Sequence, residues 1–180
     1  MKTGQKQIVA LLLGVLLAGV LAGCLSNNPT TGYTAKSQYR QGIRTVAVPI
    51  WTRGKDIYRR DIEIRLTESL VKRIELDTPY KVTTKQRADT ILTGTLEKIT
   101  QRTMSFDPDS GDPREMQITF TVSFKWEDLR TGKIIVKRQN FDVAGIYLPP
   151  VPFNEDFFQG SEDLLDKLAR RIVETMESDW

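Results

Sequence analysis

The sequence contains no histidine and a single cysteine, Cys24, among its 180 residues. Without histidine, the chain can build neither a Ser-His-Asp nor a Cys-His arrangement, and it has no histidine or cysteine set for zinc. One cysteine also excludes a disulfide within the chain. The Asp and Glu pairs that remain fall in no recognisable pocket motif. We therefore expect no enzyme, no metal and no bound cofactor, and a fold that rests on its hydrophobic core.

The sequence also lacks an apolar run of membrane-spanning length. The apolar segment Ile8–Val20 is shorter than the roughly 20 residues that a transmembrane helix needs. Lys2 and Lys6 precede this segment, and the small residues Ala22 and Gly23 follow it. A positive start, an apolar middle and small residues at a cleavage point are the layout of an export signal that is removed.

The four residues Leu21-Ala22-Gly23-Cys24 resemble the lipobox of bacterial lipoproteins. The resemblance implies that residues 1–23 are removed and that Cys24 carries covalent acyl chains on its sulfur and its new amino terminus. Leu25, rather than aspartate, follows the cysteine, and under the enterobacterial sorting rule this implies the outer membrane. The alternative is an ordinary secreted protein with an incidental cysteine.

Neither sign of charge dominates the sequence. The whole chain has 26 basic and 23 acidic residues, and the loss of Lys2 and Lys6 with the signal leaves 24 against 23. A balance this close gives no support to a nucleic-acid partner. The mature chain of 157 residues, 24 to 180, has the length of one domain.

The first part of the mature chain, residues 24–42, is predicted to be a lipidated tether. Its residues are mostly polar and include the turn-forming stretch Asn27-Asn28-Pro29. The roughly 17 residues between Cys24 and the first strand extend over at most about 60 Å. Residues 43–180 are predicted to form the folded domain.

The hydrophobic pattern of the domain predicts strands and two helices. Apolar residues alternate over residues 43–50, 80–84, 88–101, 116–128 and 134–143. The clearest signal places Ile118, Phe120, Val122, Phe124 and Trp126 on one strand face. Gly94 indicates a bulge or the close approach of another backbone. Residues 104–115 are predicted to be a polar loop, and residues 148–160 an irregular segment.

Both helices are predicted from apolar stripes. The first runs from Asp56 or Ile57 to about Leu76, with Asp56 as its N-cap, and the second runs from the cap Ser161 to about Ser178. Strands with one apolar face are typical of an antiparallel sheet with one covered face. The predicted fold class is α+β, a two-layer sandwich in which two helices pack on one face of a mostly antiparallel four-stranded sheet. The other sheet face is left for solvent or a partner.

Five motifs in register resemble the LptE family of lipopolysaccharide-assembly lipoproteins. They are the lipobox with Gly32-Tyr33, the strand 46–51, the helix with Glu63 and Leu66-Thr67, the strand 88–94, and the hairpin 128–132 with the terminal helix around Leu168–Val173. The resemblance implies an outer-membrane lipoprotein that plugs a large β-barrel, LptD, assists assembly of the barrel and helps to deliver lipopolysaccharide to the cell surface. It implies a domain on the periplasmic side or within the barrel lumen.

A cationic group surrounds the start of the first predicted helix: Arg53, Lys55, Arg59 and Arg60. Helix N-termini and arginine forks hold phosphate, so our hypothesis is a contact with glycolipid phosphates or with an acidic barrel wall. The alternative is a solvated face, since Asp56 and Asp61 offset half of the charge.

Other candidate sites have equally simple alternatives. Lys133, with Lys125, Lys137 and Arg138, is either a basic partner surface or ordinary protection of a sheet edge by lysine. The stretch Asp107-Pro108-Asp109-Ser110-Gly111-Asp112 resembles a calcium loop, but Ile118 stands where the final glutamate belongs, so we favour a solvated turn. Four aromatic residues are either anchors for a partner or part of the core: Trp51, Phe153, Phe157 and Phe158.

A second functional class stays open at this point. A regulatory lipoprotein that reaches another envelope protein, such as a cell-wall synthase, can share a strand–helix opening of this kind. The short tether favours a partner in the same membrane over a distant one.

Overall fold

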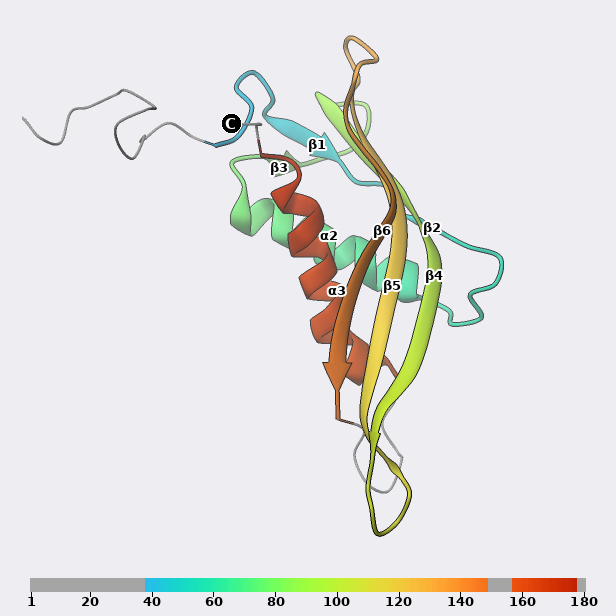
Figure 1. The fold of residues 1–180 in the computed structure, drawn as a ribbon. Helices are drawn as coiled ribbons and strands as arrows, with labels where there is room; N and C mark the ends of the chain where they lie inside the picture. Colours follow the sequence, from blue (N-terminus) through green and yellow to red (C-terminus); the bar gives the residue numbers. More distant parts are fainter. Residues whose placement is uncertain (1–37, 149–156, 178–180) are drawn as a thin grey trace, which may run out of the picture. The chain divides into compact units, whose positions relative to one another are not determined.

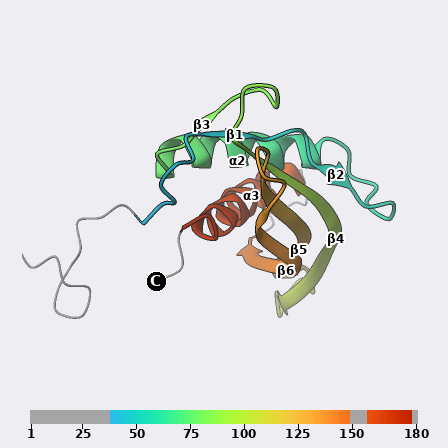
Figure 2. The ribbon, with the colours of Figure 1, turned by 90° about the horizontal axis from the view of Figure 1, so that it is seen from above.

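The computed structural model describes residues 38–148 and 157–177. Its elements are, in chain order, β1 (Thr45–Ala47), β2 (Thr52–Arg53), α2 (Ile62–Asp77), β3 (Lys81–Val82), β4 (Thr90–Phe106), β5 (Pro113–Asp128), β6 (Ile134–Tyr147) and α3 (Phe157–Glu174). Figures 1 and 2 show α2 and α3 on the same side of the sheet. The α+β fold with both helices on one face is confirmed. Cys24 and residues 25–37 of the predicted tether lie outside the described residues, as does Phe153. The end of the predicted tether, residues 38–42, is described: Tyr39 pairs with Glu177, and its hydroxyl donates to the carbonyl oxygen of Asp77 at 2.7 Å.

The sheet is mixed and has six strands rather than four. Its order is β3-β1-β4-β5-β6, and β2 pairs with β4 as well. The long strands β4, β5 and β6 pair antiparallel, as the alternating pattern predicts. The additional strands β1, β2 and β3 make parallel pairs. They are two or three residues long. β1 and β3 lie within the strands predicted at residues 43–50 and 80–84, whereas β2 is not predicted by the sequence.

The core lies between the sheet and the two helices. Ile118, Phe120, Val122, Phe124 and Trp126 of β5 are all buried, as are the α2 residues Ile62, Leu66, Leu70 and Ile74. Burying one such side chain is worth about 1.5–3 kcal/mol. The stripe of α3 completes this core with Leu164, Leu165, Leu168, Ile172 and Val173. These apolar residues of β5, α2 and α3 therefore form one core.

Gly94 makes a close approach, but to a side-chain ring rather than to the backbone that its place in a strand predicts. A Cβ atom at this position would lie 2.5 Å from Cζ3 of the Trp51 ring. The ring is buried and stacks on Phe124 with 6.1 Å between ring centroids. The backbone N–H of Trp51 also donates to Thr67 Oγ1 at 3.0 Å, so Trp51 joins the β1–β2 segment to α2. The anchor role considered for Trp51 is wrong, because the side chain is part of the core.

Two helix starts differ from the prediction. The first helix begins at Ile62, not at Asp56, and its N-cap residue Asp61 has φ 66° and makes no side-chain cap bond. Tyr58, which continues the apolar stripe by sequence, is 90% exposed. The second helix begins at Phe157, four residues before Ser161, which is buried inside it. Ser161 is therefore not a cap.

The polar segment predicted as a loop is mostly strand. Thr103 pairs with Met116, Ser105 with Glu115 and Phe106 with Pro113, so only residues 107–112 form the turn. Likewise β6 extends to Tyr147 rather than ending at Val143. Cross-strand pairing extends a hairpin beyond its apolar segment, and a hydrophobic pattern does not detect that extension.

A salt bridge joins the two helices. Arg73 Nε of α2 donates to Asp166 Oδ1 of α3 at 2.7 Å, and Arg73 Nη2 donates to the other carboxylate oxygen. Hydrogen bonding to Arg73 holds the pKa of Asp166 below its ordinary value of 3.8. A depressed folded pKa stabilises the folded state above the ordinary pKa, and that contribution is lost as the pH falls through the folded value.

Asp166→Asn is therefore expected to lower the free energy of unfolding by about 1–2 kcal/mol at pH 7, a modest value because the pair is partly exposed. Urea unfolding between pH 7 and pH 2 measures this loss. The difference in free energy of unfolding between wild type and variant is expected to shrink as the Asp166 carboxylate becomes protonated. Asp163→Asn, at an exposed position of the same helix, is the matched control and should change little. Equal losses at pH 7 and pH 2 would show that the charge plays no part.

Candidate functional site

The cationic loop, residues 53–60, connects β2 to α2. Arg53 Nη1 donates to the carbonyl oxygen of Arg59 at 2.7 Å and lies 4.0 Å from Glu63 Oε2. Arg59 Nη2 donates to Gln101 Oε1 of β4 at 3.3 Å. Arg53 and Arg59 thus fasten the loop to α2 and to the sheet. Lys55 and Arg60 are exposed and have no ion-pair partner among the described residues, so they are the cations of this group that a ligand meets first.

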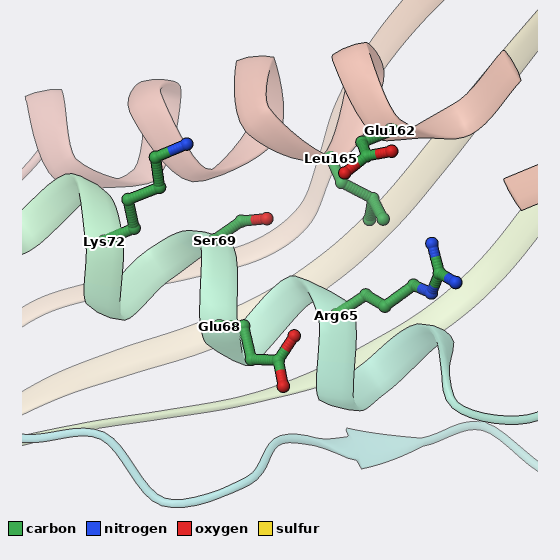
Figure 3. Close-up of a pocket in the computed structure, with 6 residues that line it drawn as sticks. All are labelled: Arg65, Glu68, Ser69, Lys72, Glu162 and Leu165. Atoms are coloured by element: carbon green, nitrogen blue, oxygen red, sulfur yellow. The ribbon is translucent and has the colours of Figure 1, made fainter. Parts of the chain in front are cut away.

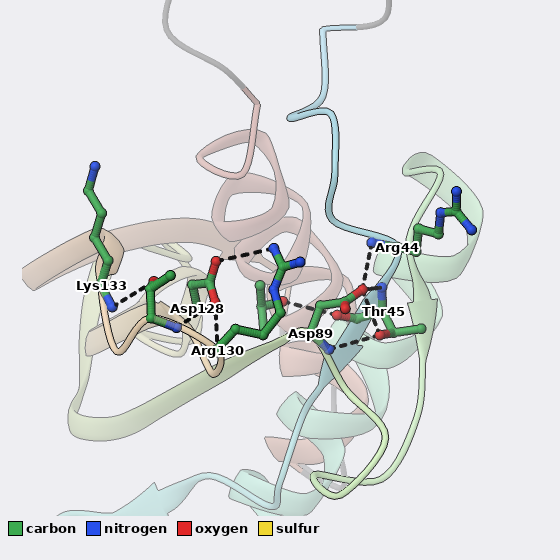
Figure 4. Close-up of polar contacts among 8 residues, drawn as sticks. Arg44, Thr45, Asp89, Asp128, Arg130 and Lys133 are labelled. Carbon is green, nitrogen blue, oxygen red and sulfur yellow. Dashed lines mark hydrogen bonds and ion pairs between the residues drawn. The ribbon is translucent and has the colours of Figure 1, made fainter.

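Lys133 lies apart from the cationic loop. It ends the β5–β6 turn, where its N–H donates to Thr131 Oγ1 at 3.3 Å and its carbonyl oxygen accepts from the N–H of Asp128 at 2.9 Å (Figure 4). Asp128 pairs with Thr90 at the start of β4, whereas Arg59 reaches Gln101 farther along the same strand. The structure therefore separates the five candidate cations into two places.

The turn end of the sheet also explains two of the sequence motifs. Asp89 Oδ2 accepts from the N–H groups of Arg44 at 3.0 Å and Thr45 at 3.1 Å, and from Thr45 Oγ1 (Figure 4). The backbone bond from Arg44, followed by the Thr45 hydroxyl, holds the pKa of Asp89 below its usual range. The carbonyl oxygen of Asp89 accepts from the N–H of Leu129 at 2.9 Å. The Asp89 and Asp128–Gly132 motifs thus meet and fix β1, β4 and the β5–β6 turn together.

The open face of the sheet carries a shallow depression of about 320 Å³. Hydroxyl groups and cations line it, among them Thr93, Thr95, Ser123, Lys125, Lys137 and Arg138. Lys125 Nζ is bound to Glu127 Oε2 at 2.8 Å, and Thr52 Oγ1 lies 2.7 Å from Thr95 Oγ1. The basic group predicted around Lys133 is thus a surface formed by Lys125, Lys137 and Arg138. Its mix of hydroxyls and cations suits a phosphorylated or sugar-bearing ligand.

A second hollow, of about 330 Å³, lies between α2 and α3. Figure 3 shows Arg65, Glu68, Ser69 and Lys72 from α2, opposite Glu162 and Leu165 from α3. Two cations and two carboxylates share this hollow, so its charge favours neither sign of ligand.

The acidic turn, residues 107–112, is held in shape by hydrogen bonds within itself. Asp107 Oδ1 accepts from the N–H of Asp109 at 2.9 Å and of Ser110 at 3.1 Å. Those backbone bonds lower the pKa of Asp107. Across residues 38–148 and 157–177, no group of acidic, histidine or cysteine side chains is arranged to hold a metal ion. The same described residues include no helix long and apolar enough to cross a membrane.

Exposed apolar side chains appear where the sequence gave no signal. Tyr58 lies in the cationic loop, and four others gather toward the far end of the long strands: Met104, Phe106, Ile146 and Leu148. Phe157 and Phe158 open α3, but their side chains lie outside the described set. An apolar residue in a strand gives the same period-two signal whether its face is covered or bare. Such exposed apolar residues can therefore be recognised only in the three-dimensional structure.

Comparison with known families identifies the chain. The profile of the LptE family, described as lipopolysaccharide-assembly, matches residues 43–179. The chain belongs to the LptE family. This is a family of non-enzymatic lipopolysaccharide-assembly lipoproteins of the outer membrane. The match confirms the resemblance to this family, and it covers all but the last residue of the predicted domain. No curated protein sequence matches the chain.

Solved structures resemble the fold at low sequence identity. A hypothetical protein from Chlamydia trachomatis is 9% identical with a TM-score of 0.51, over 74% of this chain and 95% of that one. Rare lipoprotein B from Shewanella oneidensis is 18% identical with a TM-score of 0.45, over 74% and 93%. An uncharacterized lipoprotein B from Nitrosomonas europaea is 19% identical with a TM-score of 0.47, over 81% and 88%. The Chlamydia structure supports the fold of this LptE-family domain and nothing further.

Proposed function

We propose that this LptE-family protein is an outer-membrane lipoprotein that plugs an LptD-type β-barrel and assists lipopolysaccharide assembly at the cell surface. The family match over residues 43–179 carries the proposal. Acyl chains on Cys24 anchor the domain, and the short tether keeps it near the membrane. Two helices cover one face of the sheet, so the other face is available to a partner or to glycolipid. The domain faces the periplasm or occupies the barrel lumen.

Copurification tests the barrel partner. Mild detergent extraction of the tagged full-length protein is expected to recover an LptD-type barrel. Recovery of a cell-wall synthase instead would support the regulatory-lipoprotein alternative and overturn the proposal.

The proposed glycolipid contacts are the cations Arg53, Lys55, Arg59, Arg60 and Lys133, together with the depression on the open face. Lys55 and Arg60 are exposed beside Tyr58. Lys133 borders the other end of the sheet. Guanidinium and ammonium groups bind phosphate by charge-assisted hydrogen bonds, which are stronger than neutral ones.

The double variant Arg59→Glu/Arg60→Glu tests the loop. Reversing both charges is expected to weaken binding of purified lipopolysaccharide by at least about tenfold, because the loss of even one hydrogen bond to a charged group costs about 1.5–3 kcal/mol. Affinity of the detergent-solubilised protein measures it. Lys85→Glu/Arg87→Glu makes the same charge change in the exposed turn after β3 and should leave binding unchanged. Unchanged binding by the Arg59/Arg60 variant would remove the loop from the proposed site.

A further inference from the structure

The two long edges of the sheet differ in how they are closed. On the β6 side, Lys167 Nζ of α3 donates to the carbonyl oxygen of Ala144 at 2.9 Å. Asn140 interrupts the same strand with φ 51° and donates its N–H to Ser123 Oγ at 3.2 Å. Covering contacts and irregular residues are devices that stop a sheet edge from adding another strand.

On the other side, β4 is covered along only part of its length. β1 pairs with Thr90 and Ile91, and β2 pairs with Thr95 and Leu96. No strand among the described residues pairs with this edge from Lys98 to Phe106, and in Figure 1 no other described element lies along the outer side of the lower half of β4. Bulges lie between Leu96 and Lys98 and between Thr103 and Ser105. The stretch Lys98–Thr103 is therefore regular, and it is as long as a typical strand.

The direction of the backbone groups in this stretch follows from one hydrogen bond. The Leu96 carbonyl accepts from the N–H of Gly54 at 2.8 Å, so Leu96 directs its backbone groups away from β5. Leu96 pairs with Val122, and the alternate β5 residues Phe120, Ile118 and Met116 pair with Ile99, Gln101 and Thr103. In an antiparallel ladder, alternate pairs have the same hydrogen-bond type. Ile99, Gln101 and Thr103 therefore also direct their N–H and C=O groups outward, past the edge.

The side chains along this edge are cationic and polar. Lys98 and Arg102 are exposed, and the segment from Lys98 to Phe106 contains no acidic residue. Arg59 reaches Gln101 from the helix side. A second copy of this chain, paired antiparallel, would place the Lys98 and Arg102 side chains of both copies on facing strands, and facing like charges destabilise a sheet. An extended segment with acidic side chains would instead place opposite charges across from Lys98 and Arg102, which stabilises a strand pair.

From this geometry we infer that the edge Lys98–Thr103 of β4 is a strand-addition site for an extended, acid-rich segment of the outer-membrane protein partner. This rests on the proposed function, which supplies that partner. Main-chain hydrogen bonds to Ile99, Gln101 and Thr103 provide affinity, and Lys98 and Arg102 select acidic side chains, as in other cases of β-strand addition. The two bulges set the ends of the site.

Residue-resolved hydrogen exchange of the full-length protein, alone and in its detergent-extracted complex, tests the inference. In the free protein the amides of Thr100 and Arg102, which point toward β5, are expected to exchange slowly, whereas those of Ile99, Gln101 and Thr103 are expected to exchange fast. In the complex all five amides are expected to exchange slowly. A complex whose Ile99, Gln101 and Thr103 amides still exchange fast would refute strand addition while leaving the proposed function intact.

The variant Thr103→Pro provides a second test. Proline is tolerated where a strand N–H faces solvent, but it removes the outward donor and is expected to reduce the recovered partner by about tenfold. Thr103→Ala keeps the donor and should recover the partner as wild type does. Equal recovery with Thr103→Pro would contradict the inference. Failure of wild type to recover any barrel protein would refute the proposed function, and the inference with it.

Discussion

Gly94→Ala is expected to lower the free energy of unfolding by about 2–3 kcal/mol, the upper range for overpacking a close-packed core. The new Cβ would lie 2.5–2.6 Å from three atoms of the Trp51 ring. The ring has little room to yield, because it is buried, stacks on Phe124 and sits on a backbone held by Thr67. Urea unfolding followed by circular dichroism measures the loss.

Gly145→Ala is the matched control in the same sheet. Its Cβ would lie 2.9 Å from Leu164 Cδ1, which is the end of a flexible side chain and can rotate away. We expect a loss of about 1 kcal/mol or less for this variant, since only one side-chain end must shift. If both variants lost the same stability, the Trp51 contact would not be the reason that β4 has glycine at residue 94.

Cys24→Ser is expected to release the protein from membranes almost completely. Each buried methylene of an acyl chain contributes about 0.8 kcal/mol, and one chain alone gives only marginal binding, so several chains are needed for a stable anchor. Serine cannot form the thioether that carries the diacylglycerol. Fractionation of membranes, together with incorporation of labelled palmitate, measures the effect.

Ser26→Ala changes a neighbouring residue and leaves the four residues of the lipobox intact. It should remain in the membrane fraction and incorporate palmitate as wild type does. A Cys24→Ser protein that stays with membranes would show that protein contacts, rather than lipid, hold the domain there.

The sequence pattern predicts the parts of the fold that bury a regular apolar face. Phe120 and Trp126 on β5, and Leu66 and Leu70 on α2, repeat with the period of their element and face one core. Gly94 marks the close approach of Trp51 because only the smallest residue leaves space for a ring. These predictions depend on local spacing, and local spacing is what a sequence displays directly.

The rest of the fold depends on contacts between distant residues. The sequence predicts strands where β1 and β3 lie but not their parallel pairing, in which Thr45 and Val46 pair with Lys81 and Val82. The first helix starts late because the Arg53 side chain binds the carbonyl oxygen of Arg59, which keeps the preceding residues in the cationic loop. Tyr58 is therefore exposed outside the helix, although by sequence it belongs to the apolar stripe of α2.

The candidate site is predictable in its residue types but not in its arrangement. Arginine and lysine clusters are visible along the chain, yet only the register of β4 with β5 shows that Arg59 and Lys133 lie at different places. The open edge Lys98–Thr103 has no sequence signal at all. It exists because β2 stops at Arg53 and the chain then leaves the sheet.

Identification of the protein bound in the envelope tests the central claim most directly. Tagged full-length protein, extracted with mild detergent and purified in one step, is predicted to carry an LptD-type barrel in near-equal amount. The Lys85→Glu/Arg87→Glu variant, which reverses two charges away from the proposed contacts, should recover the same barrel. Recovery of a cell-wall synthase, or of no barrel protein, would contradict the account.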